Sequence, residues 1–182
     1  MKSAQNLWHE SLRIEYTPSR PWFVAHTKAR HEKKLSDCLT HKGITNYLPL
    51  AVNISRTGGR TRFYESPLFS GYLFVSSEAG RCEEVFDTHC VANLIPVFDQ
   101  TKLVSELLGV QSALRNLAHV EPYHHVRSGL KARFVRGPMT GMEAMVVSRK
   151  REYRVLLNVE VIRRSICVEC DLDDIEIVDN NG

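Results

Sequence analysis

The sequence predicts an α+β fold, in which a ferredoxin-like α/β sandwich is followed by a small five-stranded β-barrel. Apolar, aromatic-rich segments of strand length alternate with segments of helical periodicity in the first two thirds of the chain. After residue 128 the pattern changes to short segments rich in Val and Ile, separated by turn residues, with no strong helical stripe. At 182 residues the chain is long enough for two small domains of these two kinds.

The central strand of the first domain is expected at residues 71–75, within the segment 65–75. Pro67 prevents a helix from continuing through this segment, and the apolar run after it is too short for a helix. Strand alternation places Tyr72 and Phe74 on one face of the sheet and Leu73 and Val75 on the other. The aromatic pair is then either core or, if helices cover only the opposite face, a surface for a protein partner.

The remaining elements of the first domain follow from the same patterns. Residues 22–25 and 46–50 read as strands, and residues 52–56 and 60–64 as a basic hairpin around Gly58 and Gly59. Helices are expected at residues 28–42, 80–88 and 101–117, and a last strand at residues 91–98. Their expected inward residues are Leu35, Cys38 and Leu39, then Cys82, Val85 and Phe86, then the leucine-rich stripe from Leu103 to Leu117.

The start of the first helix combines a cap with an unusual charge pattern. Thr27 is placed to cap the helix, and Gly43 to end it. The first turns carry Lys28, Arg30, His31, Lys33 and Lys34. Cations at a helix N-terminus oppose the helix dipole, which favours an external anion as their partner.

The domain boundaries are expected at two polar stretches. Residues 1–20 read as a flexible tail, residues 21–117 as the first domain, residues 118–127 as a linker that contains His124 and His125, and residues 128–182 as the barrel. The five barrel strands are expected at residues 131–136, 142–148, 153–159, 165–169 and 172–178.

Composition narrows the class of protein. Five cysteines, an odd number, fit a reducing compartment, and the polar start is unlike a signal peptide, so we expect a cytoplasmic protein with no membrane segment. Residues 21–64 hold eight Lys or Arg against two acids, and residues 127–164 hold ten against three. Such basic stretches indicate either contact with phosphate or acidic protein surface, or a solvated face.

An enzyme or metal site has little support in the sequence. Cys167 and Cys170 have CxxC spacing but no second pair, and in a strand their thiols point to opposite faces. Cys90 stands beside His89 without a third member, and adjacent strand residues do not face one substrate. We therefore expect no catalytic residues, no metal and no cofactor.

At this point two motifs, in the same order, resemble a known family. The first domain resembles that of NusG-type transcription elongation factors, including the specialised paralogues typified by RfaH. The similarity lies in residues 22–24, 47–49 and 60–62, and above all in the segment 65–75. In the second domain the similarity is to a KOW domain, which has an SH3-like barrel. The matching positions there are Gly129, Val135, Gly137, Pro138 and Gly141, with Met139 expected to pack beneath the turn.

The resemblance implies a non-enzymatic antitermination factor that binds the clamp helices of the largest RNA polymerase subunit. The matching polymerase-binding positions are Phe69, Tyr72 and Phe74. It also implies contact with the non-template DNA strand through Lys28, Arg30, His31, Thr88 and His89.

The resemblance leaves three points open. The second polymerase contact of RfaH falls here at residues 81–83, Arg-Cys-Glu, which departs from the family motif. The chain is either a specialised factor for particular operons or a general NusG factor whose barrel binds Rho or a small-subunit ribosomal protein; a ribosome-associated KOW protein that binds RNA leaves the first domain unexplained. The barrel is expected in its β form, with an RfaH-like helical hairpin as the alternative.

Overall fold

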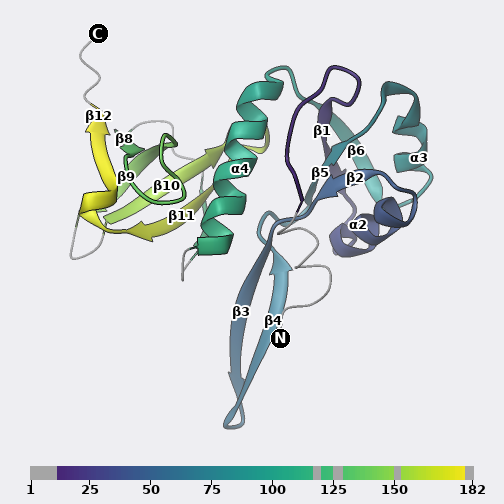
Figure 1. Cartoon of the computed structure of the whole chain (residues 1–182). Coiled ribbons are helices and arrows are strands. Elements are labelled where there is room, and N and C mark those ends of the chain that lie inside the picture. The colour runs from purple at the N-terminus through teal and green to yellow at the C-terminus, as the bar shows by residue number, and fades with distance from the viewer. Residues whose placement is uncertain (1–11, 117–119, 125–128, 150–152, 179–182) are drawn as a thin grey trace. The chain divides into compact units, whose positions relative to one another are not determined.

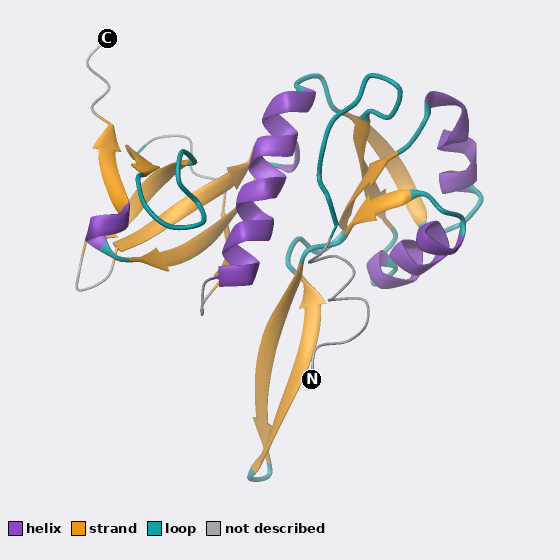
Figure 2. Ribbon diagram, in the orientation of Figure 1, coloured by secondary structure: helices purple, strands orange, loops and turns teal. Residues whose placement is uncertain are grey.

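The computed structural model describes residues 12–116, 120–124, 129–149 and 153–178, which form two compact units that divide between Gln100 and Thr101. Figures 1 and 2 show the elements of each unit. No helix in the described part of the chain is long and apolar enough to cross a membrane.

The N-terminal unit is built on a four-stranded antiparallel sheet in the order β2-β5-β1-β6. Its strands are β1 (Trp22–Thr27), β2 (Thr45–Tyr47), β5 (Tyr72–Ser76) and β6 (Val91–Pro96). The predicted central strand is confirmed, because β5 lies inside the sheet between β2 and β1. The register pairs Tyr72 with His26 and Phe74 with Val24, so these side chains share one face.

The opposite face of this sheet carries the hydrophobic core under helices α2 (Glu32–His41) and α3 (Cys82–Phe86), which follows the short helix η1 (Ala79–Arg81). Leu73 and Val75 of β5 pack there with Leu35 and Leu39 of α2 and with Val85 of α3, as predicted. The expected inward position of Phe86 is wrong, since its side chain is 46% exposed.

The first helix begins four residues later than the sequence pattern indicates. Thr27 pairs with Val91 in the sheet and is the last residue of β1, so it does not cap the helix. The chain then makes a turn in which Arg30 has φ +61°, a left-handed conformation that no α-helix contains. The helix therefore starts at Glu32, which places an acid in the first turn, where the dipole favours one.

The basic hairpin is confirmed and longer than expected. Strands β3 (Leu50–Thr57) and β4 (Arg60–Pro67) form a separate two-stranded sheet that extends away from the four-stranded sheet of the same unit. Gly58 and Gly59 have φ of +59° and +73°, the two positive values that a type I′ turn requires.

The expected N-terminal tail is packed where the structure describes it. Ile14 is buried, and the indole Nε1 of Trp22 donates to the carbonyl oxygen of Glu15 at 2.8 Å. Arg20 N donates to Thr17 O at 3.0 Å, which closes a turn just before β1. An apolar residue and an indole that needs an acceptor thus hold residues 14–20, while residues 1–11 lie outside the described part.

The C-terminal unit contains the five predicted strands and one more, in the antiparallel order β12-β8-β9-β10-β11-β7. Its strands are β7 (Val120–His124), β8 (Leu130–Phe134), β9 (Glu143–Arg149), β10 (Tyr153–Val159), β11 (Arg164–Cys170) and β12 (Ile175–Val178), with short helices η2 (Glu160–Ile162) and η3 (Leu172–Asp174). The sixth strand lies inside the expected linker, residues 118–127. That segment lacks a period of its own, but β11 offers it a partner strand.

Helix α4 (Gln100–Asn116) matches the predicted helix 101–117, but its body packs within the C-terminal unit and not within the expected first domain. A Cβ at Gly109 would lie 3.2 Å from Met142 Sδ, so the missing side chain allows the helix to approach closely. Ser112 Oγ donates to Pro138 O at 3.1 Å, and Lys102 Nζ lies 2.7 Å from Glu160 Oε2.

Candidate nucleic-acid and protein interfaces

The first group of predicted DNA-binding residues lies in the turn between β1 and α2. Lys28 and Arg30 are exposed, and His31 is half-buried at the N-cap of α2. His31 N donates to Lys28 O at 3.1 Å, and the His31 Nδ1 atom lies 2.8 Å from Ala29 O. Among the described residues, neither Lys28 nor Arg30 forms an ion pair, so both charges are available to an outside anion.

The second group lies in the turn between α3 and β6. His89 is exposed and has φ +57°, a left-handed conformation. Thr88 Oγ1 donates to Val85 O at 2.7 Å and accepts from Cys90 N at 3.3 Å, which fixes the turn on both sides of His89. The Thr88 hydroxyl is therefore occupied by its own turn, whereas the His89 ring faces solvent.

A backbone hydrogen bond joins these two turns. Lys28 N donates to Cys90 O at 2.8 Å, directly after the β1–β6 ladder, whose register shifts between His26 and Thr27. Two segments about sixty residues apart in the sequence therefore present Lys28, Arg30 and His89 from adjacent turns. Cations and an imidazole in such an arrangement can neutralise phosphate and stack on a base. We call this group the β1–β6 turn pair.

A buried carboxylate that the sequence pattern missed, Glu32, stabilises the backbone next to the turn pair through hydrogen bonds. Glu32 is 5% exposed, and its Oε1 accepts from Gly71 N at 2.7 Å. Gly71 O in turn accepts from Thr27 N at 2.9 Å, and Lys33 Nζ donates to Glu65 O at 2.8 Å. These hydrogen bonds join the first turn of α2 to β4 and to the β4–β5 turn. In the sequence, the one feature that could have indicated this role of Glu32 is its position as an acid among cations.

The predicted polymerase-binding residues occupy one face of β5 and the turn before it, at different depths. Phe74 is fully buried and Phe69 is 3% exposed; their ring centroids lie 6.3 Å apart in an edge-to-face arrangement. Tyr72 is half-buried, and its ring stacks on exposed His26 at 5.3 Å. Of the three predicted positions, Tyr72 alone reaches the surface, and it does so together with His26, which the sequence pattern did not single out.

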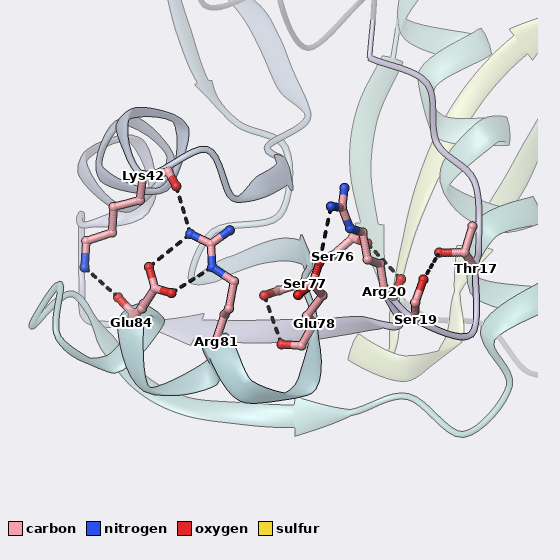
Figure 3. Close-up of polar contacts among 9 residues, drawn as sticks. All are labelled: Thr17, Ser19, Arg20, Lys42, Ser76, Ser77, Glu78, Arg81 and Glu84. Carbon is pink, nitrogen blue, oxygen red and sulfur yellow. Dashed lines mark hydrogen bonds and ion pairs between the residues drawn. The ribbon is translucent and has the colours of Figure 1, made fainter.

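Arg81, where the family motif is altered, is held by its neighbours (Figure 3). Its Nε atom lies 2.7 Å from Glu84 Oε1, and its Nη2 atom donates to Lys42 O at 2.9 Å. Lys42 Nζ donates to Glu84 O at 3.0 Å. The hydrogen bond to Glu84 raises the pKa of Arg81, and the same bond lowers the pKa of Glu84. This cation therefore joins α3 to the C-terminal end of α2 and is not a free group.

The β3–β4 hairpin carries a second basic surface. Cross-strand pairing places Val52, Ile54 and Phe63 on one face, and all three are more than half exposed. Its polar face carries Arg60 and Arg62 near the turn, as the sequence pattern indicates.

Four of the five predicted KOW positions lie in the β8–β9 connection. Gly137 and Gly141 have φ of +76° and +87°, and Gly141 N donates to Phe134 O at 2.7 Å. Met139 is 3% exposed, as expected for a residue packed beneath the turn. Val135 N donates to Asp174 O at 2.8 Å and joins this connection to η3. Pro138 lies inside the same turn, whereas Gly129 lies at the opposite end of β8, directly before Leu130.

The cysteine candidates do not form a site. Cys167 and Cys170 are both buried in β11, three positions apart and so on opposite faces. Burial raises the pKa of both thiols, that of Cys170 to about 11. Within the described part of the chain, no three His, Cys, Asp or Glu side chains are placed to hold a metal ion.

Comparison with known proteins decides the family. The sequence profile described as "Transcription termination factor nusG" matches residues 20–124, more than half of the 182 residues. The chain belongs to the NusG family. It is therefore a non-enzymatic transcription elongation factor that works with the transcription machinery.

Two solved structures are similar over most of their length. They are crystal structures of the MjSpt4:Spt5 complex in conformations B and A, with 16% and 17% sequence identity and a TM-score of 0.30 each. The matches cover 88% and 86% of this chain and 99% and 97% of those chains. No curated protein matches the sequence.

Proposed function

We propose that this NusG-family factor suppresses pausing by holding the exposed non-template DNA strand at the β1–β6 turn pair. The observation that carries the proposal is the 2.8 Å hydrogen bond from Lys28 N to Cys90 O, which brings the two predicted DNA-binding segments together. Lys28 and Arg30 supply phosphate neutralisation, and His89 supplies a ring for a base.

The proposed protein partner is RNA polymerase, through its clamp helices. Tyr72 is the contact residue that the burial pattern supports, with His26 stacked beside it. Phe69 and Phe74 support this surface from below, because both are buried in contact with each other. Tyrosine is one of the residue types enriched among the few contact residues that dominate the binding energy of protein interfaces.

The proposed C-terminal arm is a KOW barrel, residues 128–182, that recruits a further protein. The five predicted strands, the positive φ angles of Gly137 and Gly141 and the buried Met139 support this assignment. A β form in the intact chain favours a barrel that is available for binding, as in a general NusG factor. The departure from the family motif at residues 81–83 favours a specialised factor, because Arg81 binds Glu84 and the carbonyl oxygen of Lys42 and is not a free group.

Transcription by purified polymerase across a pause site, with and without this protein, tests the proposal. We expect shorter pauses with the protein, and less shortening with a Lys28→Ala variant. Lys131→Ala is the matched control, because Lys131 is an exposed lysine on β8 in the C-terminal unit, outside the turn pair. Equal pause lifetimes with and without the protein contradict the proposed activity.

A further inference from the structure

Strand β11 is an interior strand only because β7 lies beside it. It pairs with β10 on one side and with β7 on the other. Ile166, Cys167 and Val168 are each at most 2% exposed. If β7 left, this apolar segment would present an unpaired row of N–H and C=O groups, and edges of this kind pair with strands of other chains.

β7 is a short strand that contains a proline. It is five residues long and pairs from Val120, opposite Val168, to His124, opposite Arg164. Pro122 stands in its middle, opposite Ile166, and has no N–H to donate.

A charged contact joins β7 to β10, across β11. Arg154 of β10 forms an ion pair with Glu121 of β7, while its Nε lies 3.8 Å from Glu169 Oε1. That Nε is buried and has no hydrogen-bond partner among the described residues. Glu121 stands opposite Cys167, so a carboxylate at this register position meets the guanidinium of Arg154.

We propose that the edge of β11 that now pairs with β7 is a binding site for an extended segment of another protein, and that β7 is its displaceable cover. The incoming segment pairs antiparallel to β11 and carries an Asp or Glu opposite Cys167. Main-chain hydrogen bonds supply affinity in such strand addition, and the side-chain match supplies selectivity. The linker-region strand thus regulates when the C-terminal unit accepts a partner. This proposal does not depend on the proposed DNA contact.

A charge swap in the full chain tests the proposal. Glu121→Arg sets two cations against each other and should release β7, so that amide exchange at residues 166–168 accelerates at least tenfold. A labelled peptide with the natural sequence of residues 118–127 should then bind this variant at least tenfold more tightly than it binds the unaltered chain. The same peptide with Glu121→Arg should not gain affinity, because it meets Arg154 with the wrong charge.

The control is Glu176→Arg, which makes the same charge change at an exposed position of β12 in the same sheet. It should leave both exchange and peptide binding unchanged. If Glu121→Arg does not fold, as judged by circular dichroism, Glu121→Gln removes the ion pair without repulsion, and a smaller gain in the same direction is expected. Protected residues 166–168 and equal peptide affinity in the folded Glu121 and Glu176 variants overturn the proposal.

Discussion

The two candidate contact regions of the N-terminal unit are built in opposite ways. The β1–β6 turn pair is exposed and depends on backbone hydrogen bonds, with left-handed residues Arg30 and His89 in its two turns. The aromatic region is mostly buried, and only Tyr72 among its predicted members reaches solvent. The charge pattern of the sequence therefore identified residues that are exposed. The aromatic periodicity identified which side chains share a face of the sheet, but not how deeply each of them is buried.

The largest expected effects are those of substituting Phe74, which is buried, and Tyr72, which reaches the surface. Phe74→Ala should lower the free energy of unfolding by about 3–5 kcal/mol, because it empties a fully buried ring site. Tyr72→Asp should leave the fold intact and abolish binding to the clamp helices. Urea unfolding and pull-down with the clamp helices measure the two effects.

Tyr64→Asp, at an exposed aromatic on the hairpin, is the control for the Tyr72 variant. Normal clamp binding by folded Tyr72→Asp would show that β5 does not supply the contact.

The next effect concerns Glu32, whose hydrogen bond stabilises the backbone next to the turn pair. Glu32→Gln replaces a buried carboxylate acceptor of Gly71 N by a neutral amide. We expect a loss of about 1–3 kcal/mol in the free energy of unfolding, since hydrogen bonds to charged groups are the stronger kind. Chemical denaturation measures it, with Glu83→Gln on the exposed side of α3 as the neutral comparison. Equal stability of the two variants would remove Glu32 from this role.

Prediction from the sequence succeeded where local patterns are sufficient. The hairpin turn followed from two adjacent glycines, and β5 followed from Pro67 and the alternation after it. It failed where the deciding partner is distant. The start of α2 depends on Thr27 pairing with Val91, and β7 exists because β11 offers it an edge. Neither partner can be identified from the period of the segment itself.

A smaller effect is expected when the charges of the turn pair are removed. Lys28→Ala together with Arg30→Gly should change stability by no more than about 0.5 kcal/mol, because both side chains are exposed and glycine accepts the left-handed φ. DNA binding should weaken, and the slope of log affinity against log salt should fall by about 0.7 for each phosphate that the variant no longer neutralises. A salt titration of single-strand binding measures the slope, and an unchanged slope in the double variant would contradict phosphate binding by these two residues.

The smallest effect concerns the Arg81–Glu84 pair and its dependence on pH. The pKa of Glu84 is lowered by its hydrogen bond to Arg81, so the pair stabilises the fold above the carboxyl's unfolded-state pKa. That contribution disappears as the pH falls through the folded-state pKa. Thermal unfolding of Glu84→Gln and of the unaltered chain should therefore differ slightly at neutral pH and converge in acid. A difference that grows on acidification would contradict this sign.

The most direct test of the central claim is site-specific photocrosslinking in a reconstituted elongation complex. A photoreactive residue is placed at Lys28 in one protein and at His89 in another, and the crosslinked nucleotides are mapped. Because Lys28 N and Cys90 O are hydrogen-bonded, both probes should crosslink to the non-template strand at the same or adjacent nucleotides. Crosslinks to distant nucleotides, or none to DNA from either position, would contradict a single interface formed by the two turns.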